Sequence, residues 1–220
     1  MELRKSITLF FLILAGLVLN IFAPRLFMGF NYLFGSIPVL IILRFYGIWW
    51  GTLAGIIAGS WTYVLFGHPY AMVWLTIEPI FIGLILKYNA TRNLVLINTL
   101  YWPVLGIPLL WIFFKFVMHL PFVGTLPAAL MFWLIGIANS LAATIILQVT
   151  PLAKFIVDKD ELPVVSMRQA IFSMMMALVV FPAIIIMVMN GKAILKRNEQ
   201  NIIGKLYEVG KRYDQSLNII

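Results

Sequence analysis

The chain contains no cysteine and few charged residues. None of its 220 residues is Cys, and Asp, Glu, Lys and Arg together make up only 11% of them. The first absence excludes disulfides, thiol chemistry and metal sites built on cysteine. The second argues against a soluble domain, because 63% of the residues are hydrophobic and no water-soluble fold hides that much apolar surface. The composition therefore indicates a protein with several membrane spans.

The sequence also lacks the short motifs of catalysis. It has no HExxH, GxSxG, Walker or glycine-rich dinucleotide signature. Asp158, Asp160 and Glu161 cluster in a short connection without histidine, which is more typical of a solvated loop than of a metal site. We expect no catalytic residue, cofactor or metal in these residues. The net charge of +8 is explained by basic residues beside spans, so we expect no nucleic-acid partner.

Long apolar runs alternate with short polar connections. Crossing a hydrocarbon core of about 30 Å takes roughly 20 helical residues, whereas a transmembrane barrel would show strands of about ten residues with alternating polarity. The runs therefore predict an all-α polytopic bundle with about seven spans, six being the alternative. We place the spans at residues 6–23, 27–45, 47–66, 70–88, 94–118, 126–149 and 169–190. The first is read as a retained span rather than a signal peptide, because more membrane sequence follows it.

Lysine and arginine beside the spans predict the orientation. With the N-terminus in the cytoplasm, the outer connections carry Arg25 and Lys115. The inner connections then carry eight basic residues, namely Arg4, Lys5, Arg44, Lys87, Arg92, Lys154, Lys159 and Arg168. This distribution favours a cytoplasmic N-terminus. Seven spans place the C-terminal segment outside, whereas one re-entrant segment among the seven would place it in the cytoplasm.

The C-terminal segment has a helical pattern. Leu195, Ile202 and Val209 lie seven residues apart, and a second row of this kind begins at Leu206, which together give the three-four spacing of a coiled coil. An amphipathic helix on the membrane surface is the alternative. The pattern reaches the last residue without a stop signal. We therefore expect two parts, a transmembrane bundle at 1–190 and a connector helix at 191–220 that continues into a further domain.

Four glycines recur every fourth residue in the third predicted span. Gly47, Gly51, Gly55 and Gly59 form a strip of small residues on one helix face. In lipid, helices associate through close van der Waals contact, which small residues permit. The strip therefore predicts tight helix packing. The motif leaves open whether the neighbour belongs to the same chain or to a second copy.

Glu78 is the one acid that we place within the hydrocarbon. A charge there is unfavourable, so this residue must be paired, neutralised or functional. Pro79 follows it and predicts a kink. A hydrogen-bonded structural glutamate and a ligand-binding or proton-responsive group both fit. Asn98, Tyr101 and Asn139 are further polar residues at mid-span, and we expect them to converge with Glu78 on one cavity.

Two further features suggest a ligand site. Pro103 and Pro108 flank Gly106, which predicts a bent or broken fifth helix. Gly67 and Pro69 predict a tight turn around a histidine, for which an interfacial aromatic belt is the alternative reading. The complete set of candidate ligand-binding residues is Glu78, His68, Tyr70, Asn98, Tyr101, Trp102 and Asn139.

Several stretches resemble a known kind of membrane domain. The runs FNYLFGSIPVLIILRFYGIWWG, SWTYVLFGHPY, TLYWPVLGIPL and GIANSLAA, together with Glu78, are similar to the N-terminal multi-span sensory region of bacterial signalling proteins. Those proteins end in histidine kinase or diguanylate cyclase modules, and the chain has neither a phosphoacceptor histidine motif nor a cyclase motif. A weaker likeness is to the substrate-binding membrane subunits of vitamin transporters.

The resemblance implies a function in signal transduction. The expected protein is a sensory input module in the bacterial cytoplasmic membrane, with a kinase or cyclase output in the full-length protein, as in a two-component system. Its expected partners are the lipid bilayer, a small-molecule or lipid ligand, and a second copy in a homodimer. The alternative is a substrate-binding subunit of a small-solute transporter. A long connector helix favours the sensor, because a transport subunit has little use for one.

Overall fold

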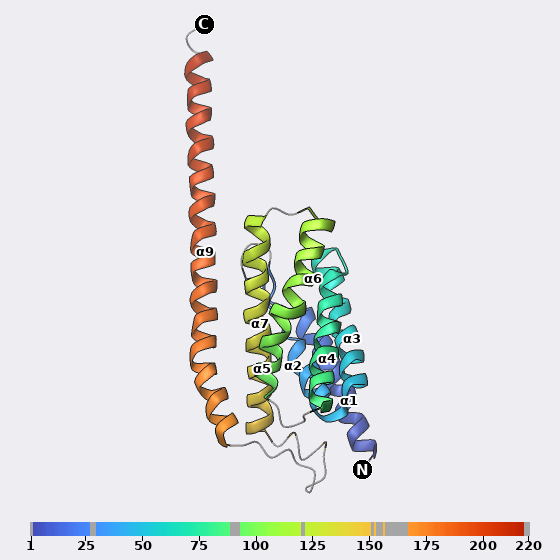
Figure 1. Ribbon diagram of the computed structural model, residues 1–220. Coiled ribbons are helices and arrows are strands. Elements are labelled where there is room, and N and C mark those ends of the chain that lie inside the picture. The colour runs from blue at the N-terminus through green and yellow to red at the C-terminus, as the bar shows by residue number, and fades with distance from the viewer. Residues whose placement is uncertain are drawn as a thin grey trace.

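The protein is a helical bundle from which one long helix projects (Figure 1). The computed structural model describes residues 2–26, 30–88, 93–119, 122–150, 152, 156 and 167–217. Within these residues the chain is helical apart from short connections and one isolated bridge between Arg25 and Asn31. The predicted all-α class is confirmed for this part of the chain.

The helices follow one another with alternating direction. In chain order they are α1 (Glu2–Ile21), α2 (Ser36–Tyr46), α3 (Ile48–Phe66), α4 (Tyr70–Tyr88), α5 (Leu94–Tyr101), α6 (Ile107–Trp111), α7 (Phe122–Val149) and α9 (Met167–Leu217). Two π-helical turns, η1 (Trp102–Gly106) and η2 (Ile112–Val117), join α5 and α6 into one continuous rod from Leu94 to Val117. We predicted a bent or broken helix around Gly106. The helix is not broken there and continues through this position as the π-helical turn η1.

Five helices in the described residues are long and apolar enough to cross a membrane. They are α1, α4, the rod from Leu94 to Val117, α7 and the first part of α9. Helix α3 has a comparable length of 19 residues, but its glycine, tryptophan and tyrosine residues keep its mean hydropathy below that of the five. The structure therefore supports a membrane-embedded bundle without showing the predicted count of seven spans.

Helix α2 corrects the predicted span at 27–45. It begins only at Ser36 and has 11 residues, which is too short to cross a hydrocarbon core. Residues 30–35, which we expected to be helical, carry no helix in the structure, and residues 27–29 lie outside the described part. The apolar run was long enough for a span, but its first part is tied to other helices by side-chain hydrogen bonds and does not continue α2.

Small residues place α3 in the middle of its neighbours. A methyl group added at Gly55 would lie 3.0 Å from the carbonyl oxygen of Leu75, and one added at Gly59 would lie 3.2 Å from the Cα of Met72, both on α4. At Gly51 the added methyl group would meet Leu43 of α2 at 2.9 Å. These distances are shorter than ordinary side-chain contacts, so α3 packs backbone to backbone within its own chain.

Gly47 has a different role from the other three glycines. No atom lies within 4 Å of a side chain built at this position. The prediction that Gly47 belongs to the packing strip is therefore wrong. The φ of 84° at Gly47 is a conformation that glycine adopts without strain. Gly47 is the joint at which the chain turns from α2 into α3.

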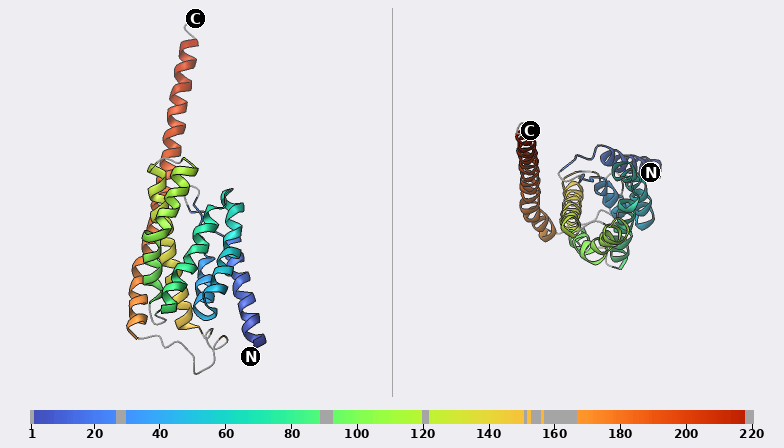
Figure 2. Two further views of the ribbon diagram at one scale, coloured as in Figure 1. Left: turned by 45° about the vertical axis from the view of Figure 1, so that its right-hand side comes forward. Right: turned by 90° about the horizontal axis from the view of Figure 1, so that it is seen from above.

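Helix α9 lies at the edge of the bundle and is 51 residues long. Its first part packs against α7 (Figure 2). Val180 and Ile184, in this part of α9, are buried. Its second part extends beyond the bundle, where Ile202 and Leu206 are exposed. The predicted boundary at residue 190 is not marked by any break in the helix. The N-terminus and the far end of α9 lie at opposite ends of the molecule (Figure 1).

Candidate functional site

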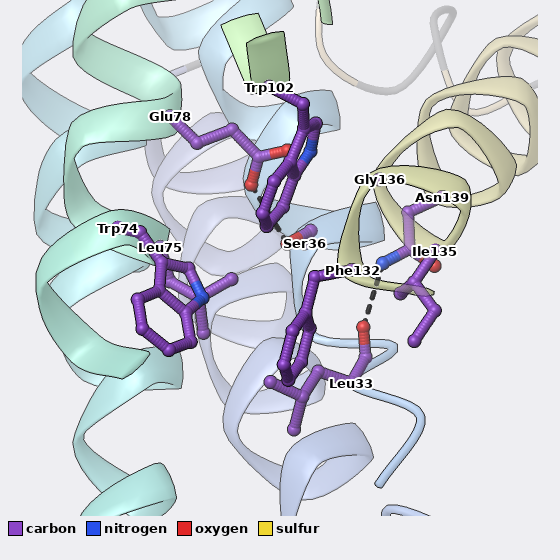
Figure 3. A pocket seen from close by; sticks show the side chains of 10 residues that line it. All are labelled: Leu33, Ser36, Trp74, Leu75, Glu78, Trp102, Phe132, Ile135, Gly136 and Asn139. Carbon is purple, nitrogen blue, oxygen red and sulfur yellow. Dashed lines mark hydrogen bonds between the residues drawn. The ribbon is translucent and has the colours of Figure 1, made fainter. Parts of the chain in front are cut away.

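A small cavity lies within the bundle, and ten residues line it (Figure 3). They come from four places in the chain, namely the segment leading into α2 and its first residue, α4, the first residue of η1, and α7. The volume of the cavity is about 10 Å³. That is room for about one water molecule. This arrangement of side chains does not accommodate a larger ligand.

Glu78 of α4 contributes the carboxyl group of this site. Its side chain is 1% exposed, and its Oε2 accepts a hydrogen bond of 3.0 Å from the hydroxyl of Ser36. Its Oε1 has no hydrogen-bond partner among the described residues. Asn98 lies beside the carboxyl group, but its amide donates to the carbonyl of Gly136 at 3.0 Å. One carboxyl oxygen of Glu78 is therefore held, and the other is left without a partner.

Helix α2 begins directly beside Glu78. Since Ser36 is its first residue, the positive end of the α2 dipole lies next to the carboxyl group. A helix that starts inside a membrane-embedded bundle needs its preceding backbone covered by protein, because lipid offers no hydrogen bonds. The N-terminus of α2 therefore favours negative charge on Glu78, as the N-terminus of a half-helix favours an anionic substrate group in transporters.

Two buried asparagines fix the backbone that leads into α2. The amide of Asn139 on α7 donates to the carbonyl of Leu33 at 2.7 Å, as Figure 3 shows. The Oδ1 of Asn20 on α1 accepts from the N–H of Gly35 at 2.8 Å, and its Nδ2 donates to the carbonyl of Ala58 at 2.8 Å. These bonds satisfy irregular backbone that would otherwise be unfavourable in a dry interior. They also connect α1, α3 and α7 to the entrance of α2.

Trp102 and Trp74 form the aromatic side of the cavity. The indole of Trp102 fits between Gly106 and Gly136, since an added methyl group at either position would meet the ring. It stacks on Phe132 at 7° between planes, and Trp74 contacts Phe132 with ring centroids 5.5 Å apart. The Nε1 atoms of both tryptophans are buried and have no acceptor within the described part of the chain. The site thus combines two free indole donors with one free carboxyl oxygen and the free Oδ1 of Asn139.

The structure brings together only part of the predicted set. Glu78, Trp102 and Asn139 line the cavity. Asn98 and Tyr101 are fully buried close by but do not line it. The hydroxyl of Tyr101 donates to the carbonyl of Trp74 at 2.6 Å, and so supports α4 about one turn before Pro79.

His68 and Tyr70 lie away from the cavity. His68 belongs to the turn between α3 and α4, and Tyr70 is the first residue of α4. The rings of Phe66, His68, Tyr70 and Phe113 follow one another with centroid separations between 4.6 and 5.9 Å. Partial burial lowers the pKa of His68 below its ordinary value of 6.5. This stack connects the turn to η2, which fits the interfacial aromatic reading better than membership of one site with Glu78.

Sequence reasoning missed Ser36, Trp74 and Phe132. Ser36 had a detectable signal, because Gly35 before it and Pro38 after it are residues typical of a helix start. Trp74 had a weaker signal, since it lies four residues before Glu78 and so on the same face of α4. Phe132 is one of many aromatic residues, and nothing local distinguishes it.

The described residues hold no other cluster of chemical interest. Among them, no group of three or more His, Cys, Asp or Glu side chains is placed to bind a metal ion. His119 is exposed beyond η2, with a positive φ of 54°. The acidic cluster of Asp158, Asp160 and Glu161 lies outside the described residues.

Comparisons of the chain with protein-family models, with curated proteins and with solved structures give no match. The function must therefore be argued from the site and the fold. The site offers a carboxyl group, a helix dipole and two indole donors around the volume of one water molecule. Such a set can hold water or exchange a proton.

Proposed function

We propose that this chain is a membrane-embedded sensory input module of a bacterial signal-transduction protein. The observation that carries the proposal is α9, a single helix of 51 residues. At 1.5 Å per residue it is about 75 Å long, far more than the roughly 30 Å of a hydrocarbon core. One uninterrupted helix therefore connects the bundle to a region well beyond it. A displacement of its first part is transmitted to its second part, as a relay requires.

The apolar face of α9 supports the same proposal. Ser173, Val180 and Ile184 are buried on the side that packs against α7. At 100° per residue, Leu195 and Ile202 lie on this same side, 22 and 29 residues after Ser173. The face that contacts the bundle thus continues beyond it as an exposed apolar row. This continuity favours the connector-helix reading over a helix lying flat on the membrane surface.

The orientation proposed is a cytoplasmic N-terminus in the bacterial inner membrane. Because successive helices alternate in direction, Arg4, Lys5, Arg44, Lys87 and Arg168 all belong to the N-terminal end of the bundle. Arg25 and Lys115 belong to the other end, and this imbalance supports a cytoplasmic N-terminus. Arg92, Lys154 and Lys159, which the sequence argument also counted, lie outside the described residues. The second part of α9 is then extracytoplasmic.

Cysteine labelling tests this orientation, because the chain has no cysteine of its own. Tyr88→Cys and Phe116→Cys replace exposed residues at opposite ends of the bundle. In intact cells an impermeant thiol reagent should label position 116 and leave position 88 unlabelled until the membrane is opened. Labelling at 88 alone would invert the proposed orientation. Gln200→Cys on α9 should behave like position 116.

We further propose that the full-length protein is a homodimer. Its kinase or cyclase output is cytoplasmic, so further segments of the full-length protein connect the extracytoplasmic part of α9 to it. The alternative, a solute-binding transport subunit, needs a cavity that admits its solute. The cavity around Glu78 has room for about one water molecule, so this cavity does not hold a solute.

The relay is tested by disturbing the bundle and following α9. Gly136→Ala adds a methyl group against the indole of Trp102, on the helix that α9 contacts. Single cysteines at Met189, Ile194 and Gln200, with Val117 as a reference, report by their labelling rates where each helix leaves the bilayer. A relay predicts that Gly136→Ala, or a change in acyl-chain length, shifts the α9 boundary by at least one residue relative to Val117.

Gly204→Ala is the matched control, because a side chain built at Gly204 meets no atom within 4 Å. It should leave every labelling rate unchanged. If the α9 boundary moves only together with the reference position under both disturbances, α9 is a rigid anchor. The sensory proposal would then be wrong.

A further inference from the structure

The cavity beside Glu78 has hydrogen-bonding groups that the fold does not use. The Oε1 of Glu78 and the Nε1 atoms of Trp74 and Trp102 are buried and have no partner within the described residues. All three side chains are at most 2% exposed and line the cavity. Unpaired polar atoms in a dry interior are unfavourable, so their presence around one space points to an occupant.

The size and chemistry of the space identify that occupant. About 10 Å³ is available, which accommodates one water molecule and no organic ligand. A water molecule accepts hydrogen bonds from an indole N–H and donates to a carboxylate or amide oxygen. It therefore matches the free indole donors together with the two free acceptors of the lining, the Oε1 of Glu78 and the Oδ1 of Asn139. The one ionisable side chain that lines the cavity is Glu78.

We propose that Glu78 is a proton-binding site, which exchanges its proton with one water molecule held between its Oε1 and the indole N–H groups of Trp74 and Trp102. The step is balanced, since a hydronium ion gives its proton to the carboxylate and leaves a carboxylic acid and water. The proposal rests on the sensory function proposed above and names the proton as the stimulus of that module.

The surroundings leave Glu78 free of a competing countercharge in the cavity. From α5, Tyr101 is the titratable group nearby, and its hydroxyl is engaged with the carbonyl of Trp74. On α2 the one charged residue is Arg44, eight positions after Ser36. On α4 the one charged residue besides Glu78 is Lys87 in the last turn. The sequences of α3, η1 and α7 contain no charged residue.

Proton binding weakens the electrostatic attraction between Glu78 and the N-terminus of α2. The carboxylate attracts the positive end of the α2 dipole and accepts from the Ser36 hydroxyl, whereas the neutral acid attracts the dipole far less. The segment before α2 is tied to α7 through Asn139 and Leu33, and α7 contacts α9. A change of charge at Glu78 therefore biases the position of α7, and through it α9.

Infrared difference spectroscopy of the purified chain in lipid nanodiscs tests the site directly. On lowering the pH we expect a carbonyl band of a protonated, buried carboxyl group to appear. Glu78→Gln should abolish this band, while Glu199→Gln, at an exposed position of α9, should retain it in full. Ser36→Ala leaves the carboxyl group in place and should shift the band frequency. This second variant keeps the test decisive if Glu78→Gln does not fold.

The same samples separate this inference from the sensory proposal. Cysteine labelling along α9 should change over the same pH range as the band, and Glu78→Gln should abolish that change. A band that titrates while α9 stays fixed would support the proton site and count against the relay. A band that is absent or independent of pH, or that survives in Glu78→Gln, would overturn the proton site. A shift of α9 with acyl-chain length would then still support the sensor.

Discussion

Helices α3 and α9 are both apolar, yet they occupy opposite kinds of position. Helix α3 buries the small residues Gly51, Ala54, Gly55, Ala58 and Gly59 and contacts α1, α2 and α4. The first part of α9 consists largely of long aliphatic and methionine side chains, and only 17% of the most apolar stretch of this helix is buried, against 50% for α7. In lipid, apolar character alone does not drive the association of helices. Side-chain size therefore determines which helix packs closely among its neighbours and forms the rigid framework of the bundle.

The difference suggests that α3 is held in place and that α9 can move. The tight surroundings of α3 resist movement, because close backbone contacts and buried hydrogen bonds are lost together when the helix shifts. Helix α9 is held by α7 on one face only. It can therefore slide or rotate while losing fewer packing contacts and hydrogen bonds. The candidate site lies between the two, since it contacts α4 on the α3 side and α7 on the α9 side.

The largest effect should follow from releasing α3 from α1. Asn20→Ala leaves the N–H of Gly35 and the carbonyl of Ala58 without their partner in a buried place. Each orphaned group costs about 1–3 kcal/mol, so we expect a loss of about 2–6 kcal/mol of stability for the two. Reversible unfolding in mixed detergent measures it. A loss below that of an exposed substitution would show that the asparagine clamp is not structural.

A slightly smaller effect should follow from widening the contact between α3 and α4. Gly55→Leu inserts a side chain where an added methyl group already lies 3.0 Å from the carbonyl oxygen of Leu75. Overpacking of this kind costs about 1–3 kcal/mol. Thermal unfolding should show the loss, and Gly204→Ala should not, because nothing lies within 4 Å of Gly204. Unchanged stability of Gly55→Leu would mean that this face is not closely packed.

The one-sided attachment of α9 predicts an asymmetry within that helix. Ile184→Ala removes a side chain buried in the contact with α7 and should cost about 1–2 kcal/mol. Leu178→Ala removes a side chain that is 76% exposed and should change stability by less than about 0.5 kcal/mol. Equal losses for both variants would indicate that α9 is surrounded rather than held on one face.

The smallest effect concerns pH at the turn between α3 and α4. Partial burial lowers the pKa of His68 from 6.5, so near that pH the unfolded chain binds more protons than the folded one. Stability should therefore be retained at neutral pH and decline slightly as the pH falls below about 6.5. Comparing melting temperatures of the wild type and His68→Phe across this range isolates the contribution. A variant with the same pH dependence would rule out His68 as its source.

Local signals in the sequence predicted much of the fold. The span predicted at 70–88 matches α4, because Gly67 and Pro69 mark the preceding turn by their backbone preferences. The helix start at Ser36 was missed, although Pro38 marks it, because the apolar run suggested a longer helix. What prevents that helix is a set of bonds from Asn20 and Asn139, residues distant in the chain, and a single sequence does not reveal such contacts.

The candidate site was predictable to a similar degree. Glu78 could be recognised because an acid in an apolar run is rare, and its carboxyl group does line the cavity. The sequence could not show that His68 and Tyr70 lie away from Glu78, because one sequence does not place helices around each other. The small size of the cavity depends on how Trp102 fits between two glycines from different segments, which only the structure shows.

Distances between spin labels on two pairs of helices test most directly whether α3 is framework and α9 is the moving element. Labels at Leu53 and Leu84 report on α3 and α4, and labels at Leu130 and Leu178 report on α7 and α9, all at exposed positions. With Gly136→Ala in nanodiscs, the α7–α9 distance should shift while the α3–α4 distance stays narrow and unchanged. An α7–α9 distance as constant as the α3–α4 distance would contradict the account.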